Sequence, residues 1–267
     1  METLFERVAA CLAATSAEEK LALTHATAQA WRDGLLSLES AIPPEPIAEP
    51  GRPDRPVLVA PSAVPRRRLG TPEGRMALLH AVAHIEFNAI NLAWDAAYRF
   101  RDLPLQYYHD WVRVADEEAR HFGLLQQRLR ELGHEYGDLP AHNGLWEMAA
   151  KTAFDPMVRM ALVPRVLEAR GLDVTPGMIQ KLHHLGDEKS VAVLETILHD
   201  EVFHVEIGSY WFKYFCDQHG LNVQTTFAGL IEQYRVNMRG PFNEAARLQA
   251  GFTAAELASF HLLPKVT

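Results

Sequence analysis

The sequence predicts an all-α protein built on a four-helix bundle. One observation is that four long segments carry apolar residues at helical spacing, over 72–101, 105–132, 156–184 and 187–217. The other is a repeated pattern, in which a lone glutamate is followed 32 or 33 residues later by a Glu-x-x-His pair. The two copies are Glu86 with Glu118-x-x-His121, and Glu168 with Glu201-x-x-His204.

Each copy of the pattern has the dimensions of a helical hairpin. In the first copy, about 15 residues lead out from Glu86 to Arg101, and about 13 lead back from Leu105 to Glu118. Because a helix rises 1.5 Å per residue, these two glutamates should lie at the same height. Asp102-Leu103-Pro104 supplies the turn, since proline ends one helix and permits another to start. The i, i+3 spacing of Glu-x-x-His directs a carboxylate and an imidazole to one point.

The six residues of the pattern form a candidate ligand set for two metal ions. They occupy core positions, as Glu118 does between Val114 and Leu125, and buried carboxylates are costly unless paired or bound to a cation. Four carboxylates and two imidazoles make a hard oxygen and nitrogen environment, which favours iron first and manganese second. The alternative is four buried glutamates paired with nearby histidines and arginines. A third pair, Glu131 with His134, lies at a predicted helix end beside Gly133 and is interpreted as incidental.

Other polar residues near the predicted ligands have weaker assignments. Ligating histidines usually donate their second ring N–H to a carboxylate, so we expect Asp200 to orient His121 and Glu117 to orient His204. The alternative is that both are exposed helix carboxylates. His80 and His84 are placed outside the ligand set, because two residues of helix turn His84 away from Glu86. The dense aromatic residues around the site are interpreted as core.

The sequence divides into N-terminal helices (1–41), a proline-rich strap (42–72), the metal-binding bundle (73–217) and a C-terminal helical extension (218–267). Ser16 and Glu19 predict a capping box for the second N-terminal helix. Val57-Leu58-Val59 is the predicted apolar anchor of the strap. Gly171 and Thr175-Pro176-Gly177 predict a kink just beyond Glu168, or alternatively a helix end followed by a short second helix. Further helices are expected over 2–14, 16–38, 223–236 and 253–261.

Composition restricts the class of function. A net charge of −8 and a pI near 5.9 argue against a general nucleic-acid binder. Two cysteines far apart provide neither a disulfide framework nor a Cys-x-x-Cys metal site. Acidic residues at the N-terminus do not fit a secretory signal, and no run of about 18 apolar residues occurs. We therefore expect a cytoplasmic protein that does not span a membrane.

Several long motifs resemble those of a known family. They are HAVAHIEFNAINLA around Glu86, ADEEARHF around Glu118, LEARGLDVTPGM around Glu168, GDEKSVAVLETILHDEVFHVEIGSYWF around Glu201, and PGRPDRPVLVAPSAVPRRRLGTPEGR in the strap. Over roughly residues 50–217 they closely resemble the domain of unknown function 455 family, within the ferritin-like superfamily. The resemblance implies a ferritin-like four-helix bundle with all six predicted ligands. It implies no substrate.

The predicted site favours a di-iron, or manganese and iron, oxidase or oxygenase that activates dioxygen or peroxide. Its expected partners are an unknown small-molecule substrate and an electron donor, and a homodimer is allowed. The alternatives are a non-catalytic metal-binding scaffold and an iron-handling protein. Iron storage predicts a minimal bundle that assembles into a shell, and the strap and extra helices would obstruct that packing.

Overall fold

The chain is helical and divides into two compact units. A computed structural model describes residues 2–65, 67–238 and 240–260. Within these ranges there are helices, loops and two isolated β-bridges, and no strand. Unit 1 comprises residues 1–150 and unit 2 comprises residues 151–267. The all-α prediction is confirmed, while the boundary between the units lies within the predicted bundle 73–217.

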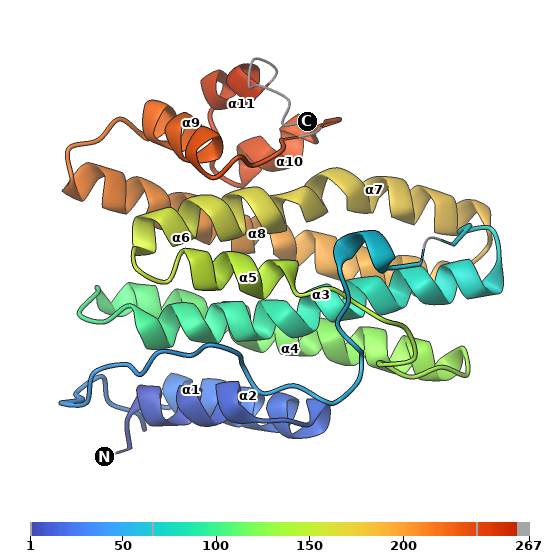
Figure 1. The fold of residues 1–267 in the computed structure, drawn as a ribbon, viewed down its shortest axis with the longest axis horizontal. Helices are drawn as coiled ribbons and strands as arrows, with labels where there is room; N and C mark the ends of the chain where they lie inside the picture. Colours follow the sequence, from blue (N-terminus) through green and yellow to red (C-terminus); the bar gives the residue numbers. More distant parts are fainter. Residues whose placement is uncertain (1, 66, 239, 261–267) are drawn as a thin grey trace. The chain divides into compact units, whose positions relative to one another are not determined.

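Unit 1 is organised around a long antiparallel hairpin, α3 and α4 (Figure 1). Two shorter helices, α1 and α2, pack on this hairpin. The helices of this unit are α1 (Leu4–Ala13), α2 (Ala17–Arg32), α3 (Pro72–Arg99), α4 (Leu105–Glu131) and α5 (Gly144–Lys151), with a short 3-10 helix η1 (Pro61–Ala63).

Local sequence signals set the ends of the hairpin helices. The Thr71 hydroxyl accepts a hydrogen bond from the Gly74 N–H at 3.0 Å, and Pro72 takes the first helical position. Asp102 adopts φ +58° in the turn between α3 and α4, a left-handed conformation that aspartate tolerates. Pro104 then precedes α4. The predicted hairpin is thus confirmed to within two residues at each end.

The N-terminal helices are capped as the sequence indicates, with one difference. The Ser16 hydroxyl accepts the Glu19 N–H at 3.0 Å, as predicted for the start of α2. The reciprocal capping box lies instead at the start of α1, where Thr3 and Glu6 each accept from the other's backbone N–H.

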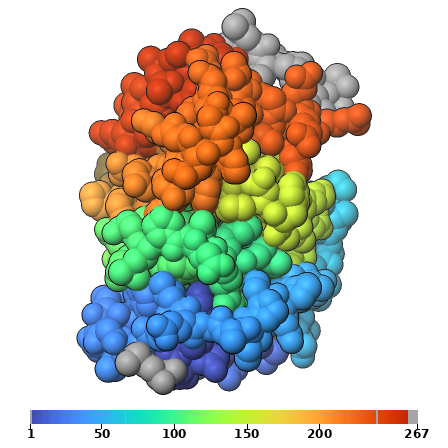
Figure 2. Space-filling view, turned by 90° about the vertical axis from the view of Figure 1, so that its left-hand side faces the viewer, coloured from blue at the N-terminus to red at the C-terminus, as the bar shows by residue number. Residues whose placement is uncertain are grey.

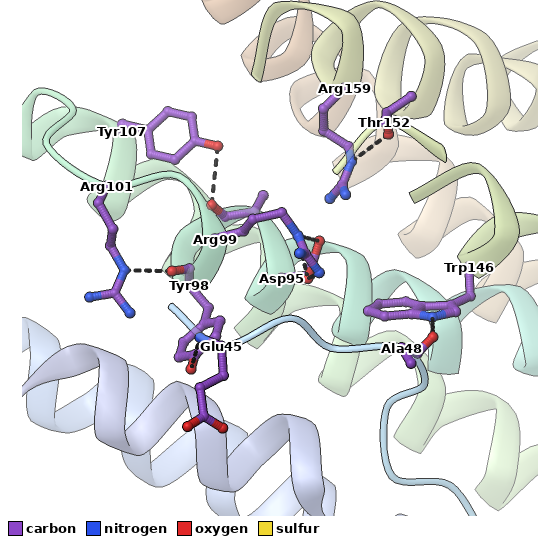
Figure 3. Close-up of polar contacts among 11 residues, drawn as sticks. Glu45, Ala48, Asp95, Tyr98, Arg99, Arg101, Tyr107, Trp146, Thr152 and Arg159 are labelled. Carbon is purple, nitrogen blue, oxygen red and sulfur yellow. Dashed lines mark hydrogen bonds and ion pairs between the residues drawn. The ribbon is translucent and has the colours of Figure 1, made fainter. Parts of the chain in front are cut away.

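The proline-rich strap is ordered and bound to the rest of unit 1 through its backbone. The Trp146 indole N–H donates to the Ala48 carbonyl at 2.8 Å, and the Tyr98 hydroxyl accepts the Glu45 N–H at 3.1 Å (Figure 3). Further on, the Val59 N–H donates to the Ala141 carbonyl at 2.8 Å. The predicted apolar anchor is therefore only partly correct, since this stretch pairs through its backbone while the Val57 side chain is exposed.

Unit 2 is built on the long helix α8, which packs against a run of consecutive helices. The run consists of α6, the π-helix η2 and α7, which together span the segment predicted as one helix, 156–184 (Figure 1). The helices of this unit are α6 (Pro156–Leu162), η2 (Val163–Glu168), α7 (Ala169–His184), α8 (Glu188–Gln218), α9 (Val223–Gln233), α10 (Glu244–Gln249) and α11 (Ala254–Phe260).

The alternative of a helix end at Thr175-Pro176-Gly177 is wrong, because α7 continues through this segment, while the kink stays a prediction. Proline in a helix leaves the carbonyl four residues earlier without its usual donor. Here that carbonyl belongs to Leu172, and the Asn243 side-chain amide donates to it at 3.1 Å. The irregularity lies earlier, in η2, where Pro164 has no N–H to give to a regular helix.

The C-terminal extension folds onto unit 2 as three short helices. Figure 2 shows α9 to α11, coloured orange to red, as one continuous cluster. Phe227, Phe252 and Phe260 form its aromatic core, with ring centroids 5.8–6.2 Å apart. The sequence predicted α9 and α11, whereas α5 and α10 were missed. Among the described residues, no helix is both long and apolar enough to cross a membrane.

Candidate metal centre

Unit 1 brings three of the predicted ligands together in its core. Glu86 projects from α3, while Glu118 and His121 project from one face of α4. All three side chains are buried. The His121 Nδ1 atom lies 3.2 Å from Glu86 Oε2 and 3.4 Å from Glu118 Oε2. Each residue offers a ligand atom, and these atoms lie within 4.8 Å of one another, so this buried cluster could hold a metal ion.

Buried apolar and aromatic residues flank the ligands of this cluster along α3 and α4. Val114 and Leu125 on α4 are buried, as the sequence predicted, and so is Ala115. The Phe87 and Phe122 rings, next in sequence to Glu86 and His121, meet edge to face with centroids 5.4 Å apart. Buried carboxylates are costly unless they are protonated, paired or bound to a cation, and a metal ion would supply the compensating positive charge.

His80 and His84 are engaged in other contacts within unit 1. The His84 Nδ1 atom lies 2.9 Å from the Tyr136 hydroxyl, and its Nε2 atom lies 3.0 Å from the His142 carbonyl. The His80 Nε2 atom accepts the Gly137 N–H at 2.9 Å. These contacts agree with placing both histidines outside the ligand set.

The hydrogen bond to His80 predicts a pH dependence of stability. Burial lowers the pKa of His80 from 6.5 to about 4, and protonation would remove the acceptor for the Gly137 N–H. Between these pH values the unfolded chain binds more protons, so this contribution to stability is lost as pH falls from 6.5 to 4. One such group gives a slope of about 1.4 kcal/mol per pH unit in the free energy of unfolding. Urea titrations at several pH values between 4 and 6.5 give the free energy of unfolding of the wild type and of His80→Gln. This free energy should change less with pH in the variant, and an equal pH dependence would contradict this role.

Unit 2 contains the second predicted set, Glu168, Glu201 and His204, all buried. Glu201 and His204 share one face of α8, and the His204 Nδ1 atom lies 3.6 Å from Glu201 Oε1. Glu168 is the last residue of η2, which packs against α8. A π-turn often marks a functional site in a helix, because it changes the direction of the side chains that follow.

Gly208 permits the close packing of α8 against η2. It lies one helical turn beyond His204, and a Cβ atom at this position would overlap the Cβ and Cγ atoms of Pro164. The absence of a side chain at Gly208 thus determines how closely the Glu168-bearing segment approaches α8. Neither Pro164 nor Gly208 was singled out from the sequence, although a proline inside a helical pattern signals an irregularity.

The two carboxylates predicted to orient the ligating histidines, Glu117 and Asp200, are partly exposed on their helices. Glu117 pairs with Arg113 one turn earlier on α4, with Nε and Oε1 2.9 Å apart, and its side chain is partly exposed. Asp200 is partly exposed on α8. Their predicted roles toward His204 and His121 stay predictions. Glu131 pairs with Arg128 at the end of α4, in agreement with its interpretation as incidental.

Comparison with known proteins shows similarity over most of the chain, and not only around the predicted ligands. The family described as "Protein of unknown function (DUF455)" matches residues 13–258. The chain belongs to the DUF455 family. An uncharacterized protein of Haemophilus influenzae (strain ATCC 51907 / DSM 11121 / KW20 / Rd) is 50% identical over 213 residues, which cover 77% of this chain and 74% of that relative. No solved structure matches the chain. The DUF455 match includes all six predicted ligands and most of the C-terminal extension.

Proposed function

We propose that the protein is a di-iron, or manganese and iron, oxidase or oxygenase of the ferritin-like superfamily. In this proposal, the chain has the ferritin-like four-helix bundle that the sequence predicts. The observation that carries the proposal is the buried cluster of Glu86, Glu118 and His121, whose ligand atoms lie within 4.8 Å of one another. The same residue types recur, buried, at Glu168, Glu201 and His204.

The charge of the six residues matches two divalent cations. Four glutamates carry four negative charges when ionised, and the two imidazoles bind metal as neutral ligands. Oxygen and nitrogen donors without thiolates suit iron or manganese. When bound, these metals supply the electrons that reduce dioxygen or peroxide.

The protein's own residues would hold and shield this centre. The Nδ1 atom of His121 faces both neighbouring carboxylates and is the donor atom available to a metal in unit 1. The neighbours of the ligands along α3 and α4 include the buried side chains of Phe87, Val114 and Phe122, which would limit the access of water. Excluding water strengthens electrostatic interactions and limits side reactions of an oxidising centre.

Oxygen consumption with excess reductant tests this function against a non-catalytic scaffold or an iron-handling protein. Protein loaded anaerobically with iron(II) is exposed to air, with ascorbate as the reductant. Continued consumption beyond one turnover per site, absent in the Glu118→Ala variant, is the expected result. A single round of oxidation that then stops would contradict the enzymatic proposal. Light scattering on the same sample would reveal a large shell, which iron storage requires.

A further inference from the structure

The C-terminal extension contacts the Glu168-bearing segment on both sides of the ligand. Three residues of the extension make these contacts, and we call them the C-terminal clamp: Asn243, Arg247 and Glu256. Arg247 and Glu256 are almost completely buried. All the contacts lie within unit 2 and reach η2 or the first turn of α7.

On the N-terminal side of Glu168, Glu256 binds Arg165. The Arg165 Nη2 atom lies 2.6 Å from Glu256 Oε1, and the two side chains are 1% and 3% exposed. The Arg165 guanidinium also lies over two phenylalanine rings of the extension, Phe227 and Phe252, at 4.3 Å from each centroid. Because a buried charged pair is costly to break, this contact fixes η2 three residues before Glu168.

On the C-terminal side of Glu168, Arg247 and Asn243 bind the start of α7. The Arg247 guanidinium donates to both carboxylate oxygens of Asp173, at 2.9 and 2.8 Å, and to the Ala169 carbonyl at 3.3 Å. Asn243 donates to the Leu172 carbonyl and, through its backbone N–H, to Asp173. A bidentate arginine pair restrains orientation as well as distance.

We propose that the residues of the C-terminal clamp are positioning residues, which hold the metal ligand Glu168 in place by binding Arg165 before it and Asp173 after it. The need for them arises from η2, because this π-turn interrupts the regular α-helical hydrogen bonding in the segment that ends at Glu168. Directional, buried contacts on both sides of the turn compensate for this. The role of the C-terminal extension is then to keep one ligand preorganised, and this inference rests on the proposed metal function.

Amide hydrogen exchange of the metal-free protein tests the clamp directly. In Glu256→Gln, which keeps the size of the side chain and removes its charge, exchange over residues 163–173 should be roughly tenfold faster, because a charged hydrogen bond is lost. Exchange over α3 and α4 should be unchanged. The affinity of this variant for iron(II) should be roughly 10- to 100-fold lower than that of the wild type, as is typical when a residue that orients a metal ligand is replaced.

Thr253→Ala is the matched control. Glu256 also accepts hydrogen bonds from the Thr253 backbone and hydroxyl at the start of α11, and this variant weakens that cap without touching Arg165. Wild-type exchange over 163–173 and wild-type metal affinity are expected. Unchanged exchange in Glu256→Gln, or equal losses in Thr253→Ala, would overturn the clamp. Because exchange is measured without metal, it decides the clamp even if the wild type binds no metal and the proposed function fails.

Discussion

Glu118→Ala should bind at least one metal ion fewer per chain than the wild type. Its carboxylate is completely buried and lies 3.4 Å from the His121 Nδ1 atom, so alanine removes a donor from the middle of the unit 1 cluster. Mass spectrometry of metal content per chain measures this effect.

Glu131→Ala provides a control on the same helix. Glu131 also stands three residues before a histidine, but it pairs with Arg128 at the end of α4 and its side chain is partly exposed. Its replacement should leave the metal content unchanged and cost at most about 1 kcal/mol of stability. Full retention of metal by Glu118→Ala, or equal loss in both variants, would refute the assignment of Glu118 as a ligand.

Gly208→Ala should destabilise the protein and disturb the second set of ligands. The added Cβ would overlap Pro164, whose ring cannot move without shifting η2. Overpacking of this kind costs about 1–3 kcal/mol. For a chain of this length, each kcal/mol lowers the melting temperature by roughly 2–4 °C. A shift of η2 also displaces Glu168, so the variant should bind metal more weakly.

Gly171→Ala is the control for this substitution. Gly171 lies inside α7, and a Cβ there would meet nothing within 4 Å. Alanine should therefore stabilise the helix by roughly 0.5–1 kcal/mol. Calorimetry measures the melting temperatures. The same melting temperature for Gly208→Ala and the wild type would contradict the predicted overlap between the added Cβ and Pro164.

Much of each unit could be predicted from the sequence, because its helices are determined by local signals. Periodic apolar residues gave the two hairpins, and Thr71, Ser16 and Asp155 accept backbone N–H groups where helices begin. The i, i+3 spacing correctly predicted that Glu118 and His121 share a buried face, and the 32-residue spacing correctly placed Glu86 beside them.

The features that escaped prediction depend on residues far apart in the sequence. Pro176 is accommodated in α7 because Asn243, 67 positions later, binds the carbonyl that proline leaves without a donor. Arg165 is buried because Glu256, 91 positions later, pairs with it. No local pattern signals such partners. The strap's backbone pairing with Ala141 is a further example, since the sequence indicated that Val57-Leu58-Val59 is anchored by its apolar side chains.

Metal content per chain, with an absorption spectrum after anaerobic reduction and again after exposure to air, distinguishes a redox-active metal centre from a scaffold without one. The protein is purified without added metal, and a second sample is loaded with iron(II) under anaerobic conditions. We expect about two iron ions, or one iron and one manganese, per chain, with a spectral change that requires oxygen. Protein that holds only zinc or no metal, and that takes up no iron anaerobically, would contradict it.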